Sequence, residues 1–317
     1  MGLLTTSPGS LPLPVELRAA RWRHSEGELD AAGLRAAEEL ATRAAIAAQE
    51  SLGLDLLVDG QLDRSDMVSF FADRVEGTEP AGLVRCFDNF YVRKPRIADA
   101  LVRREPITLE RWRFAQSLTA RPVKAVLTGP FTLAAWSFDE HYASRREACL
   151  AWAEILGEEA AELAAAGARE IQLDEPAIAA YPAELPFAVA GLERVTAGLA
   201  GRARTWVHLC YDIPPAIVPG LARLPVDGLL LELAHSGFRL LDALAGWPQD
   251  KLLAAGIVDV LDPAVESAAE LVARARRLLA LVPRERLWLT PDAGLRALQA
   301  EPARQKLAAL VAAASEL

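Results

Sequence analysis

The sequence has few cysteines, no excess of positive charge and no long apolar run. Its three cysteines, Cys86, Cys149 and Cys210, are an odd and sparse set for 317 residues. Such a set argues against a disulfide framework and indicates a reducing compartment. Charged residues interrupt the apolar runs well before the roughly 18 residues that a membrane span requires. Because the N-terminal segment also lacks a basic region followed by an apolar one, we expect a cytoplasmic protein.

The charge balance disfavours nucleic acid as a partner, and the short apolar runs give no support for a membrane partner. The chain has 34 Lys and Arg against 43 Asp and Glu, a net charge of −9. Nucleic-acid binding needs clustered basic residues, whereas the Arg residues here are scattered beside Glu along predicted helices. With 52% hydrophobic residues the chain can bury a large core. Its length would allow two domains, but a single domain over residues 1–317 is the simpler interpretation.

Short apolar, β-prone runs alternate with long stretches rich in Ala, Leu, Glu and Arg that have helical periodicity. Gly53 is positioned to end a helix over Ala31–Leu52, and Pro283 follows a second helix over Ala264–Leu281. The eight predicted strands are Leu3–Ser7, Leu54–Asp59, Val123–Thr128, Glu170–Asp174, Thr205–Leu209, Gly228–Glu232, Leu252–Val258 and Arg286–Thr290.

Eight strand-then-helix units predict an α/β fold, a single (β/α)8 TIM barrel. The connection from Asp59 to Val123 is too long for one helix. Its Arg74–Val92 portion has the mixed Gly, Pro and aromatic composition of an active-site insertion or short hairpin. We therefore expect an insertion after the second strand.

Chemically distinctive residues follow the predicted strands. His208 and Cys210 alternate on one strand, so an imidazole and a thiolate can converge on one metal ion. Glu232 lies in an apolar run, where only a partner or a metal makes a buried carboxylate tolerable. These three residues predict an open zinc site. Barrel enzymes place their sites at the C-terminal ends of strands, and the other polar candidates there are Ser10, Gln61, Asp63, Asp174, Glu175 and Asp292.

An ordered set of motifs resembles the catalytic barrel of cobalamin-independent methionine synthase, in a short form without the N-terminal barrel. Any one motif is weak alone, but their order along the chain is specific. The matching segments are Thr6–Pro12, Asp59–Met67, Val123–Thr132, Ile171–Ala177, His208–Tyr211, Glu232, Gly256–Val260, Val265–Ser267 and Pro291–Leu295. The resemblance implies a zinc-dependent methyltransferase that acts on a thiol, with homocysteine as the small-molecule substrate and methionine as the product.

The family holds zinc with a His-x-Cys pair, a Glu and a second Cys. The resemblance carries the first three ligands onto His208, Cys210 and Glu232. The family's Pro-Asp-Cys-Gly-Leu, however, corresponds here to Pro291–Leu295 with Ala293 in place of cysteine. An alanine methyl cannot bind a metal, yet three protein ligands and an open position still describe a catalytic zinc site.

The resemblance also assigns the substrate residues. Ser10 would bind the carboxylate of the amino-acid thiol, and Asp174 would hold its ammonium group. Gln61 stands where the family has a Glu for that ammonium group, so part of a charge-assisted hydrogen bond is lost. The predicted catalytic residues are Asp174 and Glu175, which also fit a helix N-cap pair before Pro176. The substrate-binding candidates are Ser10, Gln61, Asp63, Asp174 and Trp136.

Two positions bear on the methyl donor. Folate-using members have a His in the loop after the seventh strand, where this chain has Leu261, and Ala180 replaces an acidic group that contacts the pterin. Trp136 matches a folate-stacking tryptophan. Two of the three folate-contacting residues are thus replaced and one is kept. This predicts a methylcorrinoid such as methylcobalamin as the methyl donor, and a corrinoid protein as a partner.

Two other classes of function stay open. One is a metal-free barrel of the superfamily that includes uroporphyrinogen decarboxylase, in which His208 and Cys210 are a packed core pair. The other is a non-catalytic relative that binds an amino acid or corrinoid, which Ala293 and Gln61 would favour. Metal content separates the first from a zinc enzyme, and a methyl-transfer assay separates the second.

Overall fold

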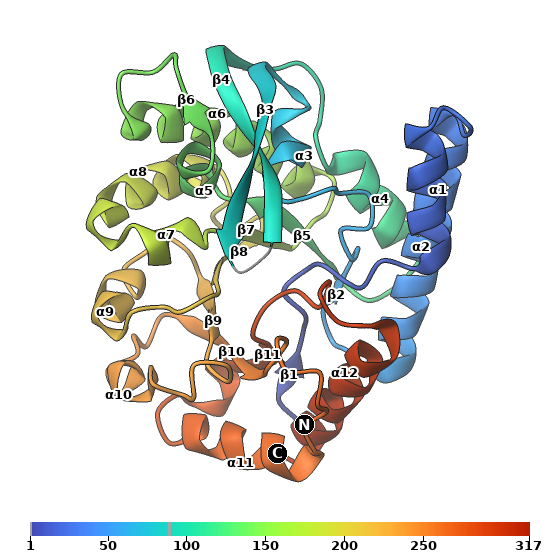
Figure 1. The fold of residues 1–317 in the computed structure, drawn as a ribbon. Coiled ribbons are helices and arrows are strands. Elements are labelled where there is room, and N and C mark those ends of the chain that lie inside the picture. The colour runs from blue at the N-terminus through green and yellow to red at the C-terminus, as the bar shows by residue number, and fades with distance from the viewer. Residues whose placement is uncertain (1, 88–89) are drawn as a thin grey trace. The chain divides into compact units, whose positions relative to one another are not determined.

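The main sheet of the computed structural model has eight strands. The structure describes the backbone of residues 2–87 and 90–317. It describes the side chains of residues 2–83 and 93–317. The strands are β1 (Leu4–Thr5), β2 (Leu57–Val58), β5 (Val123–Thr128), β7 (Glu170–Asp174), β8 (Arg204–Leu209), β9 (Gly228–Glu232), β10 (Leu252–Val258) and β11 (Leu287–Pro291) (Figure 1). Their order in the sheet is β1-β11-β10-β9-β8-β7-β5-β2.

This order follows the chain, and an isolated parallel bridge between Thr6 and Leu56 also joins the ends of β1 and β2. Sequential parallel strands in that arrangement are the topology of a (β/α)8 barrel. The predicted fold class is therefore confirmed. Strands β5, β7, β9 and β10 have the predicted bounds. In β9 and β10 most residues are apolar and buried, as expected for parallel strands covered on both faces.

Strand β2 is shorter than the predicted Leu54–Asp59. The side chain of Gln49 accepts from the backbone N of Val58 at 3.0 Å and donates to its carbonyl at 2.8 Å. The Gln49 side chain thus occupies the N–H and C=O groups of Val58, which a longer strand would use to pair with its neighbour. Before the strand, the Asp55 carboxylate accepts from the backbone N and the hydroxyl of Thr5, both at 2.8 Å.

The helices carry local start and stop signals. Helix α2 has the predicted bounds, since Asp30 caps Gly33 N at 2.7 Å and Gly53 ends the helix with φ of 91°. The helices are α1 (Val15–Ser25), α2 (Ala31–Leu52), α3 (Ser69–Ala72), α4 (Leu109–Ser117), α5 (Pro130–Ala135), α6 (Arg145–Ala165), α7 (Ala177–Ala180), α8 (Leu185–Thr196), α9 (Val218–Leu221), α10 (Leu241–Leu244), α11 (Ala268–Leu279) and α12 (Ala300–Ser315).

Helix α11 begins later than predicted. Ser267 and Glu270 form a capping box, in which Ser267 Oγ accepts from Glu270 N and the Glu270 carboxylate accepts from Ser267 N. Residues 264–266 belong instead to the loop after β10. That loop contains Glu266, whose carboxylate is buried and paired with Lys306.

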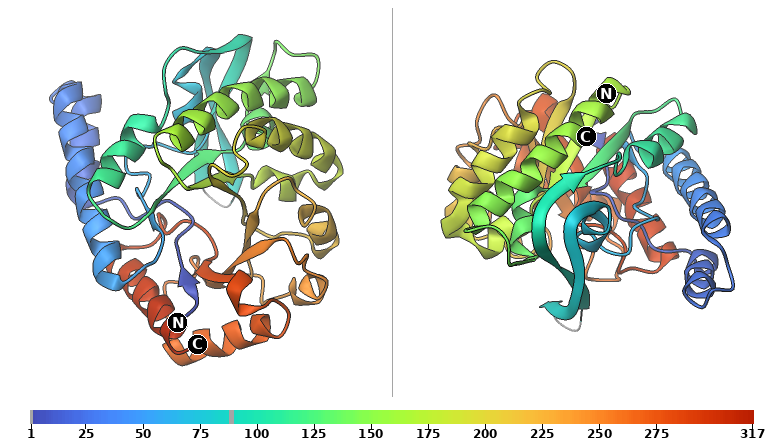
Figure 2. Two further views of the ribbon diagram at one scale, coloured as in Figure 1. Left: turned by 180° about the vertical axis from the view of Figure 1, so that it is seen from behind. Right: turned by 90° about the horizontal axis from the view of Figure 1, so that it is seen from above.

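The insertion after the second strand is an antiparallel hairpin of β3 (Val75–Phe87) and β4 (Phe90–Arg103), extended by β6 (Phe138–Asp139). It forms a strongly twisted ribbon (Figure 2). The hairpin runs further than the predicted Arg74–Val92, and its second strand ends at Arg103. That guanidinium is 2.8 Å from the fully buried Glu159 carboxylate on α6, which fixes the base of the hairpin.

The chain divides into two compact units. Unit 1 comprises Met1–Asp63, Arg111–Ala125 and Gly228–Leu317; unit 2 comprises Arg64–Glu110 and Val126–Asp227. The prediction of one domain over residues 1–317 stays a prediction. In the part of the chain that the structure describes, no helix is both long and apolar enough to cross a membrane.

Candidate active site

In unit 2, Asp174 and His208 face each other at the C-terminal ends of β7 and β8. The two residues are register partners in the parallel pair, and His208 Nδ1 lies 3.1 Å from Asp174 Oδ1. Gln172 Nε2 donates to the same carboxylate oxygen at 2.6 Å. All three side chains are buried. Gln172 was not predicted as a site residue, although its alternation with Asp174 along the strand puts both on one face.

Cys210 is the first residue after β8 and is buried, and it forms no disulfide with any cysteine whose side chain the structure describes. The next two residues, Tyr211 and Asp212, have φ of 65° and 61°. Two consecutive residues other than glycine in the left-handed region are uncommon, and such backbone strain gathers at functional sites. The predicted site at the end of β8 stays a prediction.

Glu175 has a buried carboxylate that binds the first turn of α5. Its oxygens accept from Phe131 N at 3.0 Å and from Thr132 N and Oγ1, both at 2.7 Å. A Cβ at Gly129 would lie 2.2 Å from Glu175 Cδ, so this approach requires glycine. Burial raises the pKa of Glu175 to about 7, against the opposing effect of the three hydrogen bonds. These contacts give the carboxylate a structural role. Its predicted catalytic role stays a prediction.

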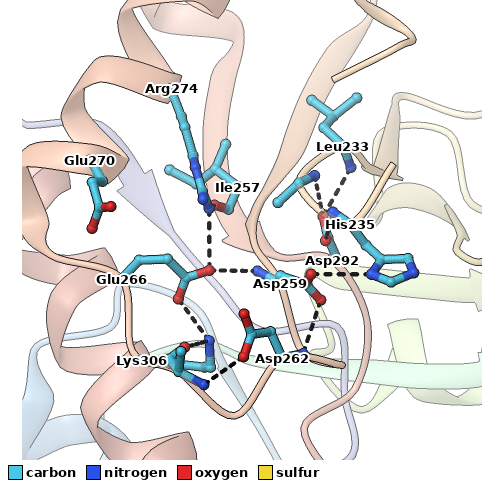
Figure 3. A network of polar contacts seen from close by, with 12 residues as sticks. Leu233, His235, Ile257, Asp259, Asp262, Glu266, Glu270, Arg274, Asp292 and Lys306 are labelled. Atoms are coloured by element: carbon cyan, nitrogen blue, oxygen red, sulfur yellow. Dashed lines mark hydrogen bonds and ion pairs between the residues drawn. The ribbon is translucent and has the colours of Figure 1, made fainter. Parts of the chain in front are cut away.

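In unit 1, Glu232 is the last residue of β9 and is buried, as predicted. The turn that follows is held by Asp292, directly after β11. Asp292 Oδ1 accepts from Leu233 N at 2.9 Å and from Ala234 N at 3.0 Å, and Oδ2 accepts from His235 N at 2.7 Å (Figure 3). Burial raises the pKa of Asp292 to about 7, and the negative charge of Glu232 acts in the same direction.

Ser10 packs directly on the loop that follows β11. Its carbonyl accepts from Leu295 N at 2.7 Å, and a Cβ at Gly294 would lie 2.0 Å from Ser10 Oγ. Ala293, next to this glycine, is buried. The serine hydroxyl predicted to bind a carboxylate therefore lies at the loop in which alanine replaces the family's cysteine.

Gln61 is bound to the same loop. It has φ of 51°, its backbone N donates to Asp59 Oδ1 at 2.9 Å, and its carbonyl accepts from the Arg296 guanidinium. Gln61 is also buried. The structure thus brings two of the predicted substrate residues of unit 1, Ser10 and Gln61, to one short segment, Pro291–Arg296.

Asp63, the third substrate candidate in unit 1, has a different neighbourhood. Its carboxylate lies 3.6 Å from Arg111 Nε, and Arg111 Nη2 is 2.7 Å from the Glu38 carboxylate. This ion-pair cluster offers a structural reason for Asp63. Trp136 is half-buried at the end of α5, and the roles of both residues in substrate binding stay predictions.

Within the residues that the structure describes, no group of three or more His, Cys, Asp and Glu side chains is gathered closely enough to hold a metal ion. The expected ligands His208 and Cys210 belong to unit 2, whereas Glu232 belongs to unit 1. Cys149 is buried, and burial raises the pKa of its thiol. The side chain of Cys86 lies outside the described residues.

Residues 3–316 match the family described as "Cobalamin-independent synthase, Catalytic domain". The chain belongs to this family. It is 37% identical over 322 residues to a 5-methyltetrahydropteroyltriglutamate–homocysteine methyltransferase of Streptomyces avermitilis, covering 98% of this chain and 42% of that protein. It is 32% identical to a methionine synthase of Saccharolobus solfataricus, covering 98% of this chain and 93% of that protein. The cobalamin-independent synthase resemblance is thereby confirmed.

A solved structure supports the same family assignment. The B12-independent methionine synthase from Shewanella sp. W3-18-1, in complex with selenomethionine, superposes with a TM-score of 0.89 at 28% identity, over 100% of this chain and 98% of that one. The chain spans about two-fifths of the length of the Streptomyces relative. That relative is named for a folate donor, so the comparisons do not support the methylcorrinoid donor expected from Leu261 and Ala180.

Proposed function

We propose that the protein transfers a methyl group to the thiol of homocysteine and forms methionine. The observation that carries the proposal is the family match over residues 3–316. It is supported by the gathering of Ser10 and Gln61 at the segment Pro291–Arg296. The Saccharolobus relative of nearly equal length is named a methionine synthase, and the Shewanella structure holds selenomethionine.

The donor set fits zinc in its chemistry. His208, Cys210 and Glu232 each lie at the C-terminal end of a strand, and each side chain is buried. The Asp174 carboxylate at His208 Nδ1 is the partner that typically orients a metal-binding imidazole and leaves Nε2 as the ligand atom. Imidazole, thiolate and carboxylate are the common protein ligands of zinc. When bound, zinc would lower the pKa of the substrate thiol.

The remaining residues would bind and orient the amino acid. Ser10 would donate its hydroxyl to the substrate carboxylate. The Asp174 carboxylate would accept from the substrate ammonium group, with Gln172 holding one of its oxygens in place. Gln61 would supply a neutral acceptor. Such orientation of the thiol toward the donor methyl group contributes to the rate by lowering the entropic cost of the encounter.

Elemental analysis and a methyl-transfer assay test the proposal together. We expect about one zinc per chain in the purified protein, and methionine formation from homocysteine with a methyl donor. Cys210→Ala should lose zinc and activity, whereas Cys149→Ala, which removes a buried thiol of unit 2 outside the proposed ligand set, should retain both. Activity without metal would favour the metal-free barrel. Zinc without turnover on any methyl donor would favour the non-catalytic relative.

A further inference from the structure

The turn that follows Glu232 is anchored by one side chain. Three consecutive backbone N–H groups, those of Leu233, Ala234 and His235, converge on the carboxylate of Asp292 (Figure 3). Such a concave arrangement of amides is an anion site in its own right, and here the anion comes from the protein. Leu233 and Asp292 are almost completely buried, so water is a poor substitute for the carboxylate.

The neighbouring strand is adapted to this contact. Strand β10 lies between β9 and β11, and its Gly256 is the register partner of Glu232. A Cβ at Gly256 would lie 2.5 Å from Asp292 Oδ1 and 2.9 Å from the carbonyl of Leu231. The absence of a side chain at this position lets the carboxylate reach across β10 to the turn after β9.

We propose that Asp292 is a positioning residue for Glu232. The backbone of Glu232 is fixed on one side by the ladder of β9 with β10 and on the other by the amides bound to Asp292. Loss of the carboxylate would release the second anchor, and the Glu232 side chain would sample other directions. This inference rests on the proposed function, in which Glu232 is a metal ligand.

An outer layer of contacts extends the anchor to the helices of unit 1. Asp259 Oδ2 lies 3.1 Å from His235 Nδ1, and the backbone N of Asp259 donates to Glu266 at 2.8 Å. Glu266 is bound in turn by Lys306 at 2.7 Å and by Arg274 at 3.2 Å (Figure 3). The network thus connects α11 and α12 to the imidazole of His235, and the backbone N of His235 binds Asp292.

A double-mutant cycle on zinc affinity tests the proposal, with competition against a metallochromic chelator as the measurement. We expect Asp292→Ala to weaken zinc binding about 10- to 100-fold, the range typical of residues that orient a ligand. Asp292→Asn keeps one acceptor oxygen but turns an NH2 toward a donor, so its effect should be intermediate. In a Glu232→Gln background, Asp292→Ala should cause little further loss, because its effect passes through Glu232.

Controls separate this role from general destabilisation. Asp55→Asn alters an exposed carboxylate that also binds a backbone N–H, that of Thr5 in the same unit, and should lower stability without changing zinc affinity. Hydrogen exchange of the metal-free protein should show faster exchange at residues 233–235 in Asp292→Asn. Zinc affinity unchanged in both Asp292 variants, or fully additive losses in the cycle, would overturn the proposal. A wild-type protein that takes up no zinc would overturn the metal site itself, before any variants are compared.

Discussion

Gly294 lies so close to Ser10 that a Cβ at residue 294 would be 2.0 Å from the serine Oγ. The nearest atom is the end of a small side chain that can rotate, and the next nearest, the serine Cβ at 3.2 Å, needs to shift by only a few tenths of an ångström. A methyl group at residue 294 would therefore turn the hydroxyl aside without unfolding the loop. The loop after β11 thus controls the direction of the hydroxyl proposed to bind the substrate carboxylate.

Gly294→Ala should raise the KM for homocysteine by about 10- to 100-fold, corresponding to the loss of one hydrogen bond to a charged group. Zinc content should not change. Ser10→Ala should have a similar effect, and the double variant should be no worse than either single one, since all three remove the same bond. Gly246→Ala, where a Cβ meets nothing within 4 Å, is the matched control. Additive losses would contradict this account.

Ala293→Cys should raise zinc affinity. A thiolate at about 2.3 Å from the metal would restore a strong ligand at the position where the family has cysteine. Chelator competition measures the change. Ala297→Cys, at the exposed position directly after the segment Pro291–Arg296, controls for a thiol that is merely nearby. Equal affinities for Ala293→Cys and wild type would mean that the loop no longer directs residue 293 at the metal.

The methyl donor depends on whether a proton can be delivered to the leaving group. A folate donor requires one at its departing nitrogen, whereas methylcobalamin does not. Leu261→His should therefore raise turnover with methyltetrahydrofolate and leave turnover with methylcobalamin unchanged, with Leu261→Gln as a polar control of similar size. Leu261 is 44% exposed, so the substitution should not disturb packing. Efficient folate turnover by the wild-type protein would contradict the expectation of a corrinoid donor.

Glu175 should make stability depend on pH. Its pKa is about 7 in the folded protein, above its ordinary value of 4.5, so the folded state holds the proton more tightly than the unfolded state. Proton binding by Glu175 therefore adds at most about 3 kcal/mol to the free energy of unfolding. This stabilisation is fully present below pH 4.5 and is lost as the pH rises through about 7.

Urea unfolding at several pH values measures this dependence. The difference in unfolding free energy between wild type and Glu175→Gln should shrink or reverse from pH 5 to pH 8. Thr132→Val removes the hydroxyl that donates to Glu175 and accepts from Ala177 N, but it keeps the titrating group, so the pH dependence of its stability should follow the wild type more closely. Parallel curves for wild type and Glu175→Gln would show that the carboxyl does not titrate in this range.

Local sequence signals determined many of the strands and helices of this protein. Apolar runs defined strands such as β9 and β10 with their observed bounds, because a strand buried on both faces needs no alternation. Asp30 and Gly53 set the ends of α2, since caps act within one turn of a helix. The ordered motifs were sufficient for the family.

Only the tertiary structure decided what the carboxylates do. Glu175 follows β7 and suggests a cap for the adjacent helix, yet it binds the amides of Phe131 and Thr132, more than forty residues away. Asp292 binds amides of a turn 57 to 59 residues earlier in the chain. A carboxylate satisfies its lone pairs with whichever donors folding brings near, and for parallel strands those donors come from distant segments, which local sequence patterns do not reveal.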